Sequence, residues 1–122
     1  MEWTFDSSLP VYQQITAQIR GAVLSGEYLP GSRIPPVREL ATVARVNPNT
    51  MQRALAELER DGLLVSGGAA GRFVTEDRAV LEQLRRDMVL HTAKNCMRQF
   101  ATLGISPAQA AEILLHLQEE DM

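Results

Sequence analysis

The chain has 122 residues, of which 45% are hydrophobic and 22% charged, and its formal net charge is −3. This length suits one compact domain with a short appendage and is enough to bury a core. The sequence has no apolar run long enough for a membrane span and no basic-then-apolar leader, so we expect neither a membrane protein nor a secreted one. The single cysteine, Cys96, excludes an internal disulfide framework and fits a reducing cytoplasm.

The first predicted helix runs from Pro10 to about Ser25. Its apolar residues recur at spacings of three and four and form one stripe: Tyr12, Ile15, Ile19 and Val23. Gly26 ends the helix, and the turn at residues 30–31 follows. Residues 33–34 are expected to add a very short strand. The next predicted helix covers about 36–44, and Pro36 starts it with a fixed φ but without a capping hydroxyl.

A third helix follows, and its start is clearly marked. Asn47 is a good N-cap and Pro48 suits the first helical position. One side of this helix carries the apolar residues Met51, Leu55 and Leu58. The other side carries residues able to hydrogen-bond base edges or phosphates: Asn49, Thr50, Gln52 and Arg53. Such a helix suits the DNA major groove, and the alternative for these four residues is an ordinary solvated helix face.

Two short strands are predicted after Gly62, over residues 63–66 and 72–74, with a glycine-rich tip between them. The tip, residues 67–71, carries no charge, and Arg72 lies directly beside it.

The rest of the chain predicts two helices, one from about Thr75 to Leu103 and one after Gly104. Ser106 and Gln109 form a capping box at the start of the last helix. Both helices carry apolar stripes that so short a segment cannot bury alone, so a second copy of the chain is the expected cover. The residues expected at this dimer interface are Leu84, Met88, Phe100, Leu114 and Leu117.

The charge is unevenly distributed along the chain. Nucleic-acid binders are usually basic, so a net negative charge is unexpected for one. Residues 33–53, however, hold four arginines against one glutamate, which gives +3. Residues 76–122 hold five basic residues against eight acids, which gives −3. The positive field is therefore local and modest.

Six blocks of sequence, in order, resemble the winged helix-turn-helix domain of the GntR family of bacterial transcription regulators. They lie between residues 10 and 74 and read PVYQQI, PG, VRELA, VNPNT, ALAELERDGLL and GRFV. The remaining short helical part is similar to the YtrA-like subfamily, which carries a small helical dimerisation region. Two departures are Pro36, where relatives commonly have serine, and the hairpin tip, where they usually have arginine or lysine that reaches the DNA backbone or minor groove. The resemblance therefore implies that Arg72 is the one basic residue left for that contact and that the wing contributes little to DNA affinity.

The resemblance implies a mainly α fold with a small β-hairpin: a winged helix-turn-helix domain at 1–75 and a two-helix dimerisation region at 76–122. It implies a homodimeric transcription regulator, most often a repressor in this family, that binds a near-palindromic double-stranded DNA operator. Arg38 is then expected to contact a phosphate or guanine, the alternative being a surface arginine paired with an acid. Arg45, in the turn, either touches a phosphate or is solvated.

Other functions have less support in the sequence. The uncharged tip and the net acidity favour, as an alternative, a winged-helix module that binds another protein with weak DNA affinity. An enzyme is not expected, because there is no nucleophile–base constellation and no phosphate-cradling loop. His91 and His116 lack metal-ligand spacing, and Cys96 fits a buried apolar position better than a redox sensor. No cofactor is expected, and a small-molecule effector stays unknown.

Overall fold

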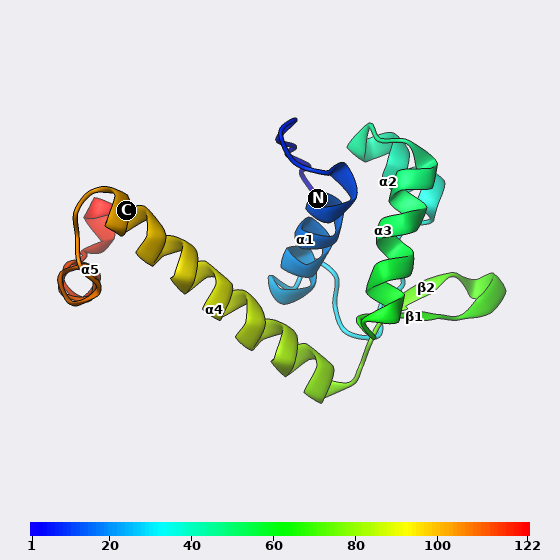
Figure 1. Ribbon diagram of the computed structural model, residues 1–122. Helices are drawn as coiled ribbons and strands as arrows, with labels where there is room; N and C mark the ends of the chain where they lie inside the picture. Colours follow the sequence, from blue (N-terminus) through cyan, green and yellow to red (C-terminus); the bar gives the residue numbers. More distant parts are fainter. The chain divides into compact units, whose positions relative to one another are not determined.

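A computed structural model describes the whole chain, Met1–Met122, which is mainly helical with one two-stranded antiparallel hairpin (Figure 1). This confirms the predicted fold class. The chain divides into two compact units, Met1–Leu84 and Arg85–Met122. The elements in chain order are α1 (Val11–Leu24), α2 (Val37–Ala44), α3 (Pro48–Arg60), β1 (Leu64–Ser66), the 3-10 turn η1 (Gly68–Ala70), β2 (Arg72–Val74), α4 (Arg78–Thr102), α5 (Pro107–Leu115) and the 3-10 turn η2 (Glu119–Asp121).

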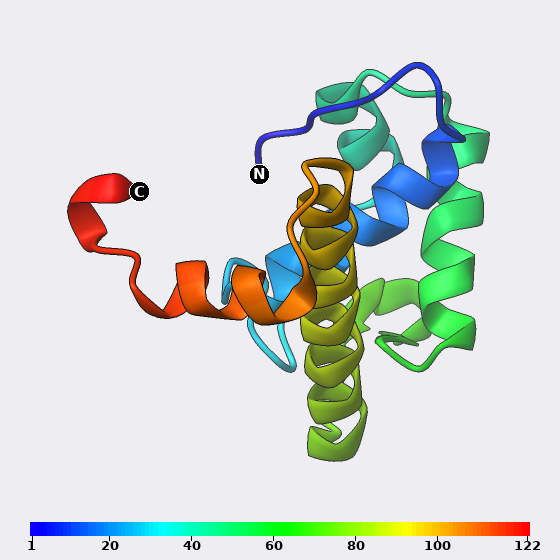
Figure 2. The same cartoon turned by 60° about the vertical axis from the view of Figure 1, so that its left-hand side comes forward.

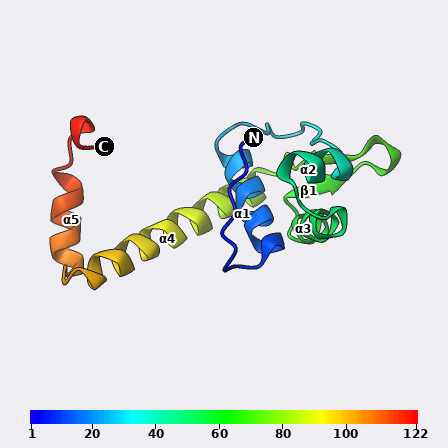
Figure 3. The same cartoon turned by 90° about the horizontal axis from the view of Figure 1, so that it is seen from above.

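Helix α3 is the centre of the first unit, because it contacts α1, α2 and β1 (Figures 1 and 3). Its apolar side is completely buried, and so are the two isoleucines of α1 that join the same core. These fully buried residues are Ile15, Ile19, Met51, Ala54, Leu55 and Leu58. The predicted apolar stripes of α1 and α3 are therefore the two halves of one core, and this core fixes which side of α3 faces solvent.

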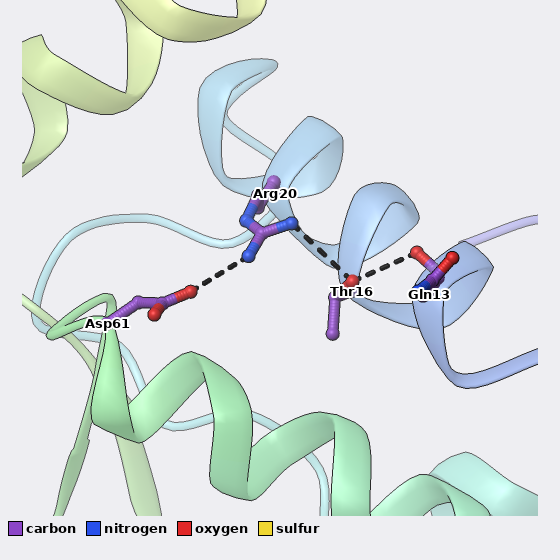
Figure 4. Close-up of polar contacts among 4 residues, drawn as sticks. All are labelled: Gln13, Thr16, Arg20 and Asp61. Atoms are coloured by element: carbon purple, nitrogen blue, oxygen red, sulfur yellow. Dashed lines mark hydrogen bonds and ion pairs between the residues drawn. The ribbon is translucent and has the colours of Figure 1, made fainter.

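Polar contacts between α1 and the end of α3 secure the same arrangement (Figure 4). The Arg20 guanidinium donates to the Asp61 carboxylate at 2.9 Å, which ties α1 to the residue that caps the C-terminus of α3. Thr16 is buried, and its hydroxyl is satisfied by the Gln13 carbonyl oxygen at 2.9 Å. This partly covered ion pair thus ties the C-terminal end of α3 to α1.

Two glutamines of α1 hold the segment that precedes the helix. The Gln18 side chain accepts from the Thr4 backbone N–H at 2.9 Å and donates to the Thr4 carbonyl at 2.8 Å. Gln14 makes the same pair of bonds with Asp6, both at 2.7 Å. This clasp keeps the aromatic rings of Trp3 and Phe5 against the core of the first unit.

The hairpin pairs β1 with β2 in the register Leu64↔Val74 and Ser66↔Arg72. An isolated bridge between Arg33 and Phe73 adds the short strand that was predicted near residues 33–34. The predicted strands agree with the observed ones to within a residue. The hairpin is the wing of a winged helix-turn-helix arrangement, and it projects from the C-terminal end of α3 (Figure 1).

The first unit continues beyond the wing to Leu84, because Leu81 and Leu84 of α4 pack against its core. Helix α4 starts later than Thr75: the Asp77 carboxylate accepts from the Ala79 N–H at 2.9 Å and so caps the helix there. The Thr75 hydroxyl instead accepts from the Asp77 N–H at 3.0 Å.

In the second unit α5 runs across the axis of α4 (Figures 2 and 3). The predicted capping box is present: the Ser106 hydroxyl accepts from the Gln109 N–H at 3.2 Å, and the Gln109 side chain accepts from the Ser106 N–H at 2.9 Å. Ala110 is fully buried, whereas no residue of α4 is buried. None of the helices has the length and apolar character needed to cross a lipid bilayer.

Candidate nucleic-acid interface

The first turn of α3 is ordered by its own cap. The Asn47 side-chain oxygen accepts from the Asn49 N–H at 2.7 Å, which confirms Asn47 as the N-cap. The Asn47 side-chain oxygen is therefore occupied by a backbone hydrogen bond. Of the four predicted readers, Asn49, Gln52 and Arg53 are exposed and Thr50 is half-buried. The N-terminal half of α3 therefore presents donors and acceptors on a helix whose position is fixed by its buried side.

Arg53 is exposed but has a partner. Its guanidinium carbon lies 3.7 Å from the centre of the Tyr12 ring of α1, which is the geometry of a cation–π contact. Stacking leaves the edge of the guanidinium, with its N–H donors, available for a phosphate or a base. Tyr12 was predicted only as a core residue, and in the structure it also supports one of the predicted DNA contacts.

Arg72 on the wing is committed to α3. Its guanidinium makes an ion pair with the Glu59 carboxylate and also donates to the Gln52 side-chain oxygen at 3.3 Å. Two predicted site residues, Arg72 and Gln52, are therefore brought into direct contact. Glu59 was not predicted as part of the site.

Strand periodicity contains a signal for this contact. Side chains two apart on a strand share a face, so Arg72 must lie on the same side of the hairpin as the buried Val74, which is the side toward α3. Gln52 and Glu59 are seven residues apart, which places them on one side of α3. The contact follows once the strand and the helix are known to pack together.

Arg38 and Arg45 are placed differently from Arg53 and Arg72. Both are exposed, and no ion pair or hydrogen bond joins either guanidinium to another residue. Arg38 lies in the first turn of α2. Arg45 ends α2 with a left-handed backbone, φ 59°, and is the one non-glycine residue with positive φ. This conformation makes the short turn that joins α2 to α3.

The residues predicted for dimerisation fall in three environments. Leu84 packs against the core of the first unit. Met88 and Leu114 line an apolar groove of about 460 Å³ in the second unit. Phe100 is half-buried, and Leu117 is 41% exposed. Cys96 is also half-buried and lines the same groove. The groove was not predicted, because its two walls come from separate helices.

No cluster of three or more histidine, cysteine, aspartate or glutamate side chains is arranged to hold a metal ion. His91 lies 3.1 Å from the Asn95 amide, one turn along α4.

Residues 11–74 match the bacterial regulatory proteins of the gntR family. The chain belongs to the GntR family. An uncharacterized HTH-type transcriptional regulator of Bacillus subtilis, YhcF, is 34% identical over 92% of this chain and 93% of its own length. The HTH-type transcriptional repressor YtrA of the same organism is 42% identical over 58% of this chain and 55% of its own length. These relatives agree with the YtrA-like subfamily.

Solved structures give the same result for this GntR protein. A GntR family transcriptional regulator from Listeria monocytogenes is 35% identical with a TM-score of 0.83, covering 93% of this chain and all of that one. The DNA-binding domain of AraR, solved in complex with an operator, is 31% identical with a TM-score of 0.57 over 62% of this chain and 96% of that one. The protein is therefore a DNA-binding transcription regulator of the GntR family.

Proposed function

We propose that this GntR protein is a cytoplasmic homodimeric repressor that binds a near-palindromic operator with α3 in the major groove. The observation that carries the proposal is the capped first half of α3, where Asn49, Gln52 and Arg53 are exposed while the opposite side is locked in the core. A rigid helix with polar readers near its N-terminus is how helix-turn-helix proteins meet base edges.

We propose that arginines around this helix contact the phosphate groups of the DNA backbone. Arg38 and Arg45 carry guanidinium groups without intramolecular partners, so all of their donors are available for phosphate. Arg53 and Thr50 complete the set on α3. For Arg72 the sequence predicted a direct phosphate contact, while its bonds to Glu59 and Gln52 support a different role, argued below.

The second unit supports the homodimer. It exposes large apolar residues on both helices, among them Val89, Leu90, Ile113 and Leu114. The groove between α4 and α5 adds an apolar surface lined by Met88, Met97 and Leu114. A second copy presenting the same surface would cover these residues, and two copies would set the spacing of two α3 helices along the operator.

Selection of bound sequences from a random pool of duplexes tests the proposal directly. The expected product is an inverted repeat whose half-sites are separated by about one helical turn or a multiple of it. A reporter promoter carrying that sequence should then lose transcription when the protein is supplied. A single unrepeated half-site would contradict the dimer, and increased transcription would contradict repression.

The alternative function, a protein-binding winged helix with weak DNA affinity, has one specific observation in its favour. The wing tip, residues 67–71, carries no charge, and Arg72 beside it is paired with Glu59. Measuring the affinity for the selected duplex at about 50 mM and about 200 mM salt separates the two functions. Phosphate contacts impose a steep loss of affinity as the salt concentration rises. Weak binding with no sequence preference at either salt would favour the alternative.

A further inference from the structure

Three side chains form a continuous link from the wing to the DNA-reading side of α3. The Arg72 Nε atom pairs with Glu59 Oε1, and Arg72 Nη1 donates to Gln52 Oε1 at 3.3 Å. The Arg72 and Glu59 side chains are only 19% and 31% exposed, whereas Gln52 is exposed. Two of these residues are thus partly covered supports, and the third is the one that reaches solvent.

The orientation of the Gln52 amide follows from donor chemistry. A guanidinium carries only donors, so the amide atom that faces Arg72 must be the oxygen. The amide nitrogen, with its two N–H donors, is then the atom that does not face Arg72. An unrestrained glutamine would rotate freely about its last torsion and offer either end to DNA.

This restraint bears on which base Gln52 can read. Glutamine recognises adenine through both ends of its amide, accepting from N6 and donating to N7. With one lone pair of its oxygen taken by Arg72, Gln52 offers the groove two N–H donors against one remaining acceptor lone pair, so the bond favours its use as a donor. Guanine presents two acceptors there, N7 and O6, and thymine presents O4.

We propose that Arg72, held by Glu59, is a positioning residue that determines specificity by fixing Gln52 as a hydrogen-bond donor toward an acceptor edge, guanine first, in the major groove. This inference rests on the proposed function, because it requires α3 to lie in that groove. Glu59 has two effects: it sets the direction of the guanidinium, and it neutralises the charge of Arg72. The wing therefore contributes to recognition through α3 and adds little attraction for phosphate.

The two possible roles of Arg72 predict different DNA-binding behaviour for variants that lack its side chain. A direct phosphate contact, once removed, lowers affinity equally for all sequences and reduces the salt slope by about one. A positioning residue, once removed, leaves the salt slope unchanged and alters the preference at one base pair. The affected base pair must be the one whose preference is lost in Gln52→Ala.

The experiment measures affinities of the 122-residue chain for its selected duplex and for the three other base pairs at each half-site position. Gln52→Ala first identifies the position that Gln52 reads, and the wild type should prefer guanine there. Arg72→Ala should reduce this preference about threefold to tenfold, the size of one neutral hydrogen bond, with adenine gaining most. The double variant should lose no more than Gln52→Ala alone, because both act through the same amide.

Two further variants control for folding and charge. Arg72→Met keeps the length of the side chain without its donors and should behave as Arg72→Ala does, even if the alanine variant melts early. Glu59→Gln keeps an acceptor for Arg72 Nε, so the base preference should persist. An Arg72→Met protein with wild-type preference at the Gln52 position, or with a salt slope lower by about one, overturns the positioning role. If the wild type itself binds no duplex specifically, the proposed function fails and this inference fails with it.

Discussion

The arginines near α3 occupy three different environments, and these decide what each can contribute to DNA binding. Arg38 has an unpaired, exposed guanidinium, Arg53 is stacked on Tyr12, and Arg72 is paired with Glu59. A paired arginine has already lost side-chain entropy, and the carboxylate beside it offsets its positive charge. An unpaired one loses that entropy only on binding but brings its full charge to the phosphate.

Arg38→Ala should weaken operator binding by about 1–3 kcal/mol if the arginine reads guanine, and should relax specificity at one base. The fold should be unaffected, because the Arg38 side chain makes no contact that the core needs. Affinity and thermal melting of the same sample check both statements. Arg60→Ala is the matched control, since Arg60 is an exposed arginine in the last turn of α3, away from the capped end. Equal affinities for both variants and the wild type would remove Arg38 from the interface.

Tyr12 offers a way to test Arg53 without touching it. Replacing the ring by Tyr12→Leu should weaken binding, but by less than Arg53→Ala, because an exposed cation–π contact contributes about 0.5–1 kcal/mol. Tyr12→Phe keeps the ring and should bind as the wild type does. Affinities of all three variants for one operator duplex give the comparison. Normal binding by Tyr12→Leu together with weak binding by Arg53→Ala would show that the stack has no role in placing Arg53.

At the scale of elements, local signals predicted helices well and long-range contacts poorly. Asn47 and Ser106 mark helix starts by short-range side-chain bonds, and both caps are present. Thr75 carried a similar signal, yet α4 starts at Arg78 because Asp77 caps it and Thr75 is buried. The Arg72–Glu59 pair joins a strand to a helix. Its geometry depends on how these two elements pack, which local sequence signals do not determine. The same holds for Arg53 on Tyr12.

A single substitution can introduce a positive charge into the uncharged wing tip. Ala70→Lys should strengthen non-specific DNA binding and steepen its salt dependence by about one phosphate contact. Ala70 is exposed, whereas Gly67 is a poor position because a Cβ atom there would lie 2.6 Å from the Phe73 ring. Ala70→Gln is the uncharged control of similar length. Salt titrations that are identical for lysine and glutamine would place the wing away from DNA.

At the scale of the whole molecule, the positive charge available to attract DNA is small and confined to one segment. Residues 33–53 carry four arginines against one glutamate, yet the chain as a whole has a net charge of −3. One copy therefore gathers limited electrostatic attraction, so in the proposed homodimer affinity would depend on joining two half-sites in one complex. When two sites are linked, the second binding step becomes intramolecular, which raises affinity by orders of magnitude without any new contact.

The groove between α4 and α5 is where we expect that linkage to be made. Leu114→Asp should convert the proposed dimer to a monomer, because it would place an unpaired charge on the apolar groove wall that we propose the second copy covers. Leu115→Asp is the matched control: Leu115 is 82% exposed against 42% for Leu114, and it does not line the groove. Sedimentation at micromolar concentration should show a monomer for the first variant and a dimer for the second. Operator affinity should fall in parallel for Leu114→Asp, while binding to an isolated half-site stays at the wild-type level because α3 is untouched. A Leu114→Asp protein that still sediments as a dimer and binds the full operator normally would place the interface elsewhere.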